Sequence, residues 1–372
     1  MILRRLTSRT ANAAVARLAD VAILMLAIVV AATSLAAPRS AYAEKIDAVG
    51  FRATPGDIFK IAVEIEDRYL RDGSLAAHVK RRLAYDGRVV SLGPENDGFR
   101  IGWTLRSFAS EILKDATGNQ PLVLAGARSA SQGFLNRELV FVANASGLPV
   151  RLDDWEAHKS AVAPIMRHAI EETISKAVLA RRPDAKPEAV AAIAGRQADT
   201  LVGALVTRHD AKGAVALVEE ATTIARVQGL GFQPGQPLVV SGSTSGPHTL
   251  GEVASTTTFK AMPRAGSEPL RIGWTTAFDT GALQEAAAAA IRRQLAAALA
   301  QIESEGIKAE VKRKFDEQIA SIRVQRADTG ESEIDPVTGW ARRVVRRTLT
   351  ETRQAGIPTE RRERVVTIAV SR

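Results

Sequence analysis

The chain has 372 residues, of which 50 are Lys or Arg, 41 are Asp or Glu and none is Cys, so its formal net charge is +9. The absence of cysteine excludes disulfides, thiolate catalysis and cysteine-ligated metals. A chain of this length buries ordinary cores in two domains without covalent or metal cross-links.

Residues 1–43 have the three parts of a secretory signal. Arginines including Arg4 and Arg5 precede an almost uncharged apolar run over residues 21–37, and Ala41-Tyr42-Ala43 supplies the small-x-small pattern of a signal peptidase site. We predict cleavage after Ala43 and a periplasmic or secreted cell-envelope protein. The alternative is an uncleaved anchor, but the run is slightly shorter than the roughly 20 residues of a spanning helix. No later stretch approaches that length, so no transmembrane segment is predicted after cleavage.

Residues 44–152 are predicted to form a first β-rich module. Apolar and mostly charged residues alternate over residues 59–66 and again over residues 99–106, which is the period of a half-buried strand. Between them, Asp86-Gly87 is the dipeptide of a tight hairpin turn.

Residues 153–228 are predicted as a three-helix insertion. Asp153 or Asp154 is a natural N-cap, and apolar residues recur at every fourth position from Val162 to Val178. Prolines at 183 and 187 separate this helix from a second one, and a third is expected over residues 211–228.

Residues 229–372 are predicted as a second β-rich module related to the first. Arg271-Ile272-Gly273-Trp274-Thr275 is identical to residues 100–104, and residues 338–341 match residues 146–149 more weakly in the same order. The two matches are 47 residues apart in the first copy and 68 in the second. A long Ala-rich helix over residues 282–319 absorbs the difference. Two colinear matches indicate an internal duplication.

The predicted fold class is therefore α+β, with two related antiparallel β modules, a three-helix insertion between them and a long Ala-rich helix in the second module. An antiparallel sheet buries at least one face, and the helices are its expected cover.

The basic character of the chain belongs to its C-terminal segment. Residues 341–372 contain nine Arg and three Glu, or +6, whereas residues 44–340 sum to about −1. We predict contact with a membrane or another anionic envelope component through Arg342, Arg343, Arg346 and Arg347. The alternative is a strand with a solvated arginine face. No nucleic-acid partner is predicted, because the chain is exported and shows no basic patch interleaved with aromatic residues.

No catalytic residue, cofactor or metal site is predicted, since the five histidines lack metal-ligand spacing and no nucleophile or phosphate-loop motif is complete. The candidate ligand-binding residues are those of the repeated pentapeptide: Trp103, Trp274, Arg100 and Arg271. The competing interpretation is that each tryptophan anchors the core of its module.

We predict a non-catalytic envelope protein that binds an apolar small molecule, a lipid or another envelope component. One alternative is a periplasmic hydrolase whose carboxylates are assembled by the fold. The other is a structural or assembly partner without a small ligand.

Overall fold

The computed structural model describes residues 51–93, 98–116, 131–208, 218–228, 236–245, 252–262, 268–299 and 305–372, together with residues 120, 124, 215, 230 and 231. The predicted signal segment 1–43 lies outside the described residues.

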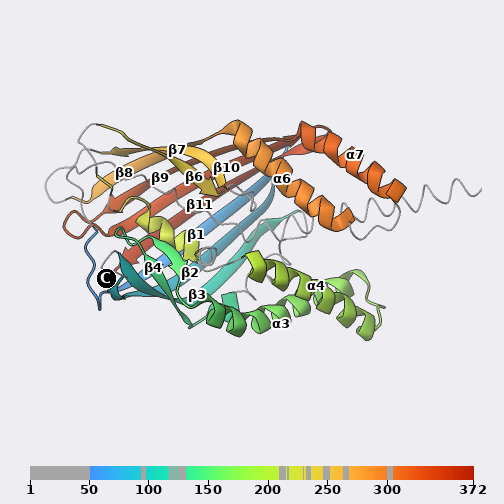
Figure 1. Ribbon diagram of the computed structural model, residues 1–372, viewed down its shortest axis with the longest axis horizontal. Helices are drawn as coiled ribbons and strands as arrows, with labels where there is room; N and C mark the ends of the chain where they lie inside the picture. Colours follow the sequence, from blue (N-terminus) through green and yellow to red (C-terminus); the bar gives the residue numbers. More distant parts are fainter. Residues whose placement is uncertain are drawn as a thin grey trace, which may run out of the picture.

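The described strands form one antiparallel sheet of eleven strands in the order β5-β4-β3-β2-β1-β11-β10-β9-β8-β7-β6 (Figure 1). The strands are β1 (Ile58–Arg71), β2 (Ser74–Leu92), β3 (Phe99–Asp115), β4 (Glu138–Ala143), β5 (Pro149–Leu152), β6 (Leu238–Ser245), β7 (Glu252–Ala261), β8 (Leu270–Phe278), β9 (Arg323–Ile334), β10 (Ala341–Gln354) and β11 (Ile357–Ser371). The helices are α3 (Trp155–Arg181), α4 (Pro187–Arg208), α5 (Glu219–Thr222), η3 (Thr223–Arg226), α6 (Thr280–Leu299) and α7 (Glu305–Ser321).

The predicted fold class, two β modules with a helical insertion, is wrong. Strand β11 pairs with β1 along one edge and with β10 along the other, so both halves of the chain belong to a single sheet. The predicted 282–319 helix is two helices, α6 and α7, and only α5 and η3 are described within the predicted third helix at 211–228. Alternation of residue types predicts strands and their buried faces, but it does not specify which strands pair.

The predicted hairpin turn at Asp86-Gly87 is also wrong. Both residues lie inside β2, and the turn between β1 and β2 is Asp72-Gly73, where both residues have positive φ, 48° and 77°. Gly87 is needed for packing, because a Cβ atom at this position would lie 2.1 Å from Cε2 of Phe59 and leave no room for its ring. The ring of Phe59 thus lies directly over the backbone of the neighbouring strand.

The two sequence matches occupy equivalent places in the sheet. Trp103 lies on β3, the third strand from the β5 edge, and Trp274 lies on β8, the third strand from the β6 edge. Gly147 in the β4–β5 turn has a φ of 76°, and Gly339 in the β9–β10 turn has a φ of 74°. This correspondence supports the duplication, which stays a prediction.

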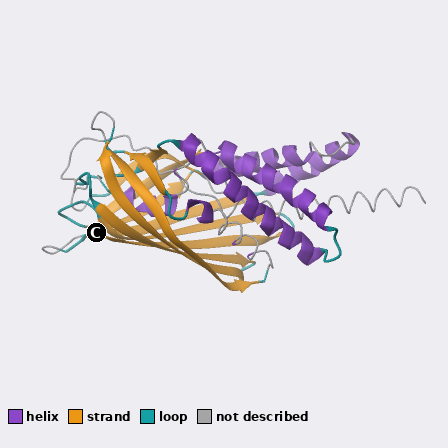
Figure 2. Ribbon diagram, turned by 90° about the horizontal axis from the view of Figure 1, so that it is seen from below, coloured by secondary structure: helices purple, strands orange, loops and turns teal. Residues whose placement is uncertain are grey.

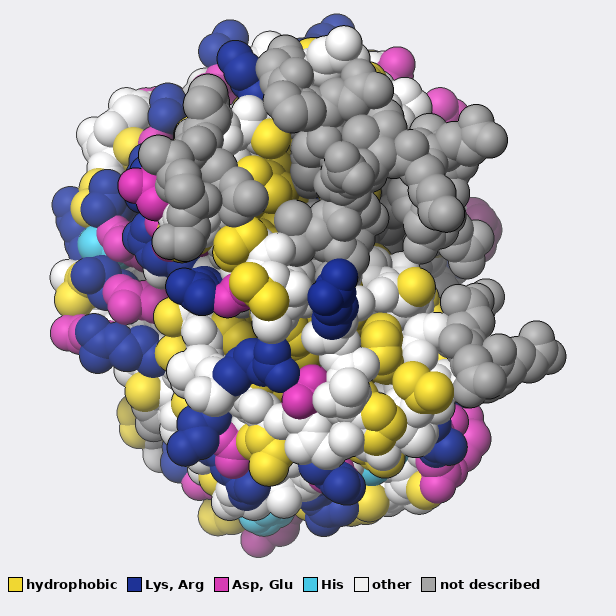
Figure 3. Space-filling view, turned by 90° about the vertical axis from the view of Figure 1, so that its left-hand side faces the viewer, with side chains coloured by type: hydrophobic (Ala, Val, Ile, Leu, Met, Phe, Trp, Pro, Cys, Tyr) yellow, Lys and Arg dark blue, Asp and Glu magenta, His cyan; other side chains and the backbone are white. Residues whose placement is uncertain are grey.

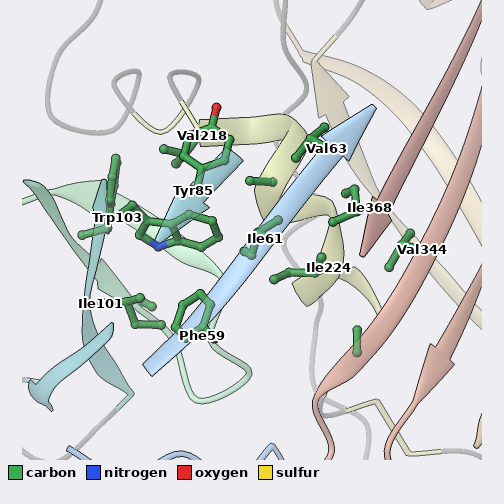
Figure 4. Packing of buried hydrophobic residues seen from close by; sticks show 14 of the residues in the cluster. Phe59, Ile61, Val63, Tyr85, Ile101, Trp103, Val218, Ile224, Val344 and Ile368 are labelled. Atoms are coloured by element: carbon green, nitrogen blue, oxygen red, sulfur yellow. The ribbon is translucent and has the colours of Figure 1, made fainter. Parts of the chain in front are cut away.

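The sheet is strongly curved, and α5 and η3 lie within its concave face (Figures 1 and 2). The main core fills this face. Inward side chains of β1, β2, β3, β10 and β11 meet Val218 and Ile224 there (Figure 4). A second cluster, including Val253 and Leu283, packs α6 against β7 and β9. Among the described helices, none combines the length and the apolarity that a bilayer crossing requires.

Candidate ligand-binding site on the concave face

One part of the concave face is apolar and rich in aromatic residues. The alternate residues Phe59, Ile61, Val63 and Ile65 of β1 all point inward and are at most 2% exposed. The ring of Phe59 lies edge-on to that of Trp103, with 5.6 Å between the centroids. The concave face therefore carries a continuous hydrophobic lining around its central strands.

A row of inward polar residues, here called the polar belt, crosses the same face further along the strands. Strand register places its members side by side from β1 through β11, β10, β9 and β8 to β7. They are Asp67, Arg364, Thr348, Asp328, Thr276 and Thr257. Polar groups inside a protein require partners, so the belt defines where buried hydrogen bonds and ion pairs must form.

Asp67 is the centre of the first buried ion cluster. Its carboxylate accepts hydrogen bonds from Arg81 at 2.6 Å and from Arg362 at 2.8 Å, and its side chain is 3% exposed. Burial alone would raise the pKa of Asp67, but the charges of Arg362, Arg364 and Arg81 outweigh burial and hold the pKa below its ordinary value. Asp67 is therefore ionised at neutral pH.

Asp328 is the centre of the second cluster. Both of its oxygens accept from Nε of Arg346 at 3.0 Å, and Oδ2 also lies 3.4 Å from Nη1 of Arg226. Arg226 donates to the Thr276 hydroxyl at 3.0 Å as well, and that hydroxyl lies 2.9 Å from the hydroxyl of Thr257. Burial acts to raise the pKa of Asp328, but Arg346 and Arg226 lower it overall.

Residues 218–228, here called the inner segment, contain α5 and η3 and connect the apolar lining with both clusters. Its apolar side chains, including Ala221 and Ile224, are buried in the main core. Its charged side chains reach the belt, where Glu220 pairs with Arg364 and Arg226 pairs with Asp328. Burial would raise the pKa of Glu220, but Arg364 and Arg81 lower it. Two ion pairs and an apolar face thus hold the inner segment in place.

The two predicted tryptophans lie in the main core. Trp103 is 2% exposed and Trp274 is 3% exposed, as their interpretation as core anchors requires. Their indole Nε1 atoms are nevertheless buried without a hydrogen-bond partner among the described residues, and so is the hydroxyl of Ser332. A buried donor without a partner costs about 1–3 kcal/mol.

Arg100 and Arg271 do not join the tryptophans. Each lies an odd number of residues from its tryptophan, which places it on the convex face of its strand. Arg100 is paired with Asp153, and Arg271 is 60% exposed with its guanidinium 4.0 Å from Glu333. The structure thus separates the residues that the pentapeptide groups in sequence.

The four predicted C-terminal arginines do not form one surface either. Arg342 is paired with Asp335, and Arg343 and Arg347 are exposed, whereas Arg346 is buried beside Asp328. Burial raises the pKa of Asp335, but hydrogen bonds from Arg342 and two backbone N–H groups lower it to about 2 overall. Contact with a membrane or partner through the exposed arginines stays a prediction.

Hydrophobic side chains are also exposed at the end of the sheet near the C-terminus. Figure 3 shows them gathered between basic and acidic side chains. Ile58 at the start of β1 is 65% exposed, and Val337 in the β9–β10 turn is 70% exposed. Among the described residues, no group of three or more His, Asp or Glu side chains is placed to hold a metal ion.

Sequence reasoning missed the buried ion clusters. Their common signal is a charged residue on the same strand face as buried apolar residues, two positions further along the strand. Asp67 follows Ile65 in this way, and Arg346 follows Val344. Arg81, Arg362 and Arg364 carry the same signal only once strand pairing is known.

No protein-family model and no curated protein matches the chain. A solved structure described as "lipid-protein interactions in lipovitellin" is similar over 86% of this chain and 25% of the lipovitellin chain, with 6% identity and a TM-score of 0.40. This chain thus spans about a quarter of that protein. A likeness at this level carries no argument about function.

Proposed function

We propose that this chain is a non-catalytic, exported cell-envelope protein that binds an apolar or amphiphilic ligand within the concave face of its sheet. The observation that carries the proposal is the aromatic lining of that face, in which the buried indole N–H groups of Trp103 and Trp274 have no hydrogen-bond partner within the part of the chain that the structure describes. Binding sites for such ligands are mostly apolar, with a few placed polar groups.

The hydrolase alternative has less support. A general acid requires a carboxyl group with a raised pKa. The three carboxyl groups of the clusters, on Asp67, Glu220 and Asp328, instead have lowered pKa values because arginines surround them.

The test is native mass spectrometry of residues 44–372, gently purified from the periplasm, followed by denaturing extraction of any bound molecule. We expect a stoichiometric apolar or amphiphilic adduct that is absent after unfolding and refolding without lipid. A chain at the bare polypeptide mass that also fails to take up added lipids would refute the proposal.

Two variants on β9 localise the ligand. Ser332 is fully buried on the concave face, whereas its neighbour Glu331 is exposed on the convex face. Ser332→Met adds side-chain volume to the lining and is expected to reduce the bound fraction, while Glu331→Met leaves it unchanged. Thermal melts establish that both variants are folded. Equal ligand occupancy in the two would place the ligand elsewhere.

A further inference from the structure

Exposed aliphatic side chains, here called the apolar rim, lie at the end of the sheet near the C-terminus. Strand register aligns the starts of β1, β3 and β5 with the ends of β2 and β4 at this end. The β9–β10 turn lies beside them, because the N–H of Arg52, shortly before β1, donates to the carbonyl of Thr338 at 2.9 Å. The members of the rim are between 45% and 70% exposed, and they are Ile58, Leu92, Val150 and Val337.

An aromatic cluster joins the apolar rim to the lining of the concave face. The ring of Trp340, just before β10, has its centroid 4.9 Å from that of Phe59 and 4.7 Å from that of Phe51. Phe51 in turn lies edge-on to Phe99, at 5.4 Å between centroids. The indole N–H of Trp340 donates to the carbonyl of Arg52 at 2.9 Å. Packed rings therefore fix the rim to the folded sheet.

The ion pairs around the apolar rim are oriented with their arginine outward. The side chain of Arg342 is 56% exposed, whereas that of its partner Asp335 is 18% exposed. The arginine is also the more exposed member in two further pairs at this end, Arg100 with Asp153 and Arg372 with Asp57. This end of the sheet therefore presents guanidinium groups together with aliphatic side chains.

A bilayer surface fits this combination better than a protein does. Protein interfaces concentrate their apolar side chains in a packed, fully buried centre. The rim instead spreads its aliphatic side chains over the ends of separate strands, and Figure 3 shows hydrophobic side chains at this end with charged ones between them. Peripheral membrane surfaces combine apolar side chains that enter the headgroup region with basic ones that attract anionic lipids.

We propose that the apolar rim docks on the surface of an anionic bilayer, with Ile58 and Val337 in the headgroup region and Arg342 at the level of the lipid phosphates. The proposal concerns an interaction surface and requires no ligand in the concave face, so it goes beyond the proposed function. It orients the sheet with the end nearest the C-terminus toward the membrane.

The experiment is cosedimentation of residues 44–372 with two kinds of vesicle. One kind contains phosphatidylcholine alone, and in the other phosphatidylglycerol replaces part of it. Residues 44–372 include every residue that the structure describes, and they omit the apolar run at 21–37, which would itself enter lipid. We expect tighter binding to the anionic vesicles, and this binding should weaken as ionic strength rises because salt screens charges at a surface.

A dye placed on the rim tests which part of the protein meets the lipid. The chain contains no cysteine, so a single introduced cysteine carries an environment-sensitive dye at a chosen position. A dye on Val337→Cys should shift its emission to the blue on anionic vesicles. The matched control is Ile357→Cys at the start of β11, which is 45% exposed at the opposite end of the sheet and should not respond.

Paired substitutions measure the two contributions. Ile58→Ser/Val337→Ser should weaken binding to anionic vesicles at least about ten-fold, because it removes two aliphatic groups from the headgroup region, and Ile357→Ser should leave binding unchanged. Arg342→Gln should weaken binding about five-fold. Its control, Arg353→Gln, removes an exposed arginine at the other end of β10 and should have no effect. Thermal melts establish that each variant is folded.

Binding to neither kind of vesicle, or equal binding to both, would overturn the proposal. Equal dye responses at positions 337 and 357, or equal losses in the rim variants and their controls, would do so as well. A dye response at position 337 that needs no vesicles and grows with protein concentration would instead identify a second copy of the chain as the partner. None of these results depends on a ligand in the concave face, so this proposal and the proposed function fail separately.

Discussion

Asp328→Asn should be among the most destabilising conservative substitutions in this protein. Asp328 is fully buried, and its carboxylate accepts hydrogen bonds from Arg346 and Arg226. The amide of Asn keeps the volume but removes the charge, so the buried guanidinium groups of Arg346 and Arg226 both lose their ion pair with this carboxylate. Breaking a buried ion pair in this way costs about 3–5 kcal/mol, and we expect a loss of that size in the free energy of unfolding.

The matched control is Glu333→Gln on the same strand. Glu333 lies 4.0 Å from the exposed guanidinium groups of Arg271 and Arg343, and exposed pairs of this kind contribute about 0–1 kcal/mol. Urea unfolding followed by tryptophan fluorescence measures both variants, because the midpoint and slope give the free energy. The double variant Asp328→Asn/Arg346→Met should recover part of the loss, since it removes a cation together with the anion.

A loss below about 1 kcal/mol for Asp328→Asn, or one no larger than that of the control, would refute this reasoning. It would mean that the two guanidinium groups find other partners or water, and that the cluster does not depend on the carboxylate.

Three further predictions concern packing and pH. Gly330→Ala places a Cβ atom 2.1 Å from the Trp274 ring and should cost about 1–3 kcal/mol, measured by thermal melting. Gly203→Ala, within α4 and with open space around the new Cβ, should be neutral or stabilising by up to about 1 kcal/mol; a loss would contradict the helix placement. Because Asp67 and Glu220 have lowered folded-state pKa values, the stability they provide is complete above the unfolded-state pKa and disappears as pH falls through the folded-state pKa. Urea midpoints should therefore be level from about pH 7 to 5 and fall below about pH 4; a steady decline from pH 7 would contradict this.

The sequence predicts individual strands well where one face is buried throughout. The alternation from Phe59 to Ile65 correctly marks β1, and the alternation around Trp103 marks β3. The prediction of a hairpin turn at Asp86-Gly87 fails. Glycine beside an aspartate favours a turn by local preference, whereas here Gly87 makes room for the ring of Phe59 on the neighbouring strand. That requirement arises from strand pairing and leaves no local trace.

The ion clusters could be predicted only in part. Asp67 and Arg346 stand at positions whose side chains alternate toward the buried face of their strands, and this alternation can be read from the local sequence. Their partners come from distant parts of the chain, as Arg362 is 295 residues from Asp67 and Arg226 is 102 residues from Asp328. Such pairs depend on the single sheet, and a prediction of two separate modules necessarily misses them.

The position of β11 has a consequence for how the protein is made. This strand comes after the other ten described strands in the chain, yet it lies in the middle of the sheet, with five described strands on either side. The two halves cannot join until β11 has been synthesised and is free to pair with β1 and β10. A chain cut short before β11 would present two unsatisfied strand edges, on β1 and β10, and such edges promote aggregation. Completion of the sheet therefore depends on a strand that follows all the other described strands in the chain.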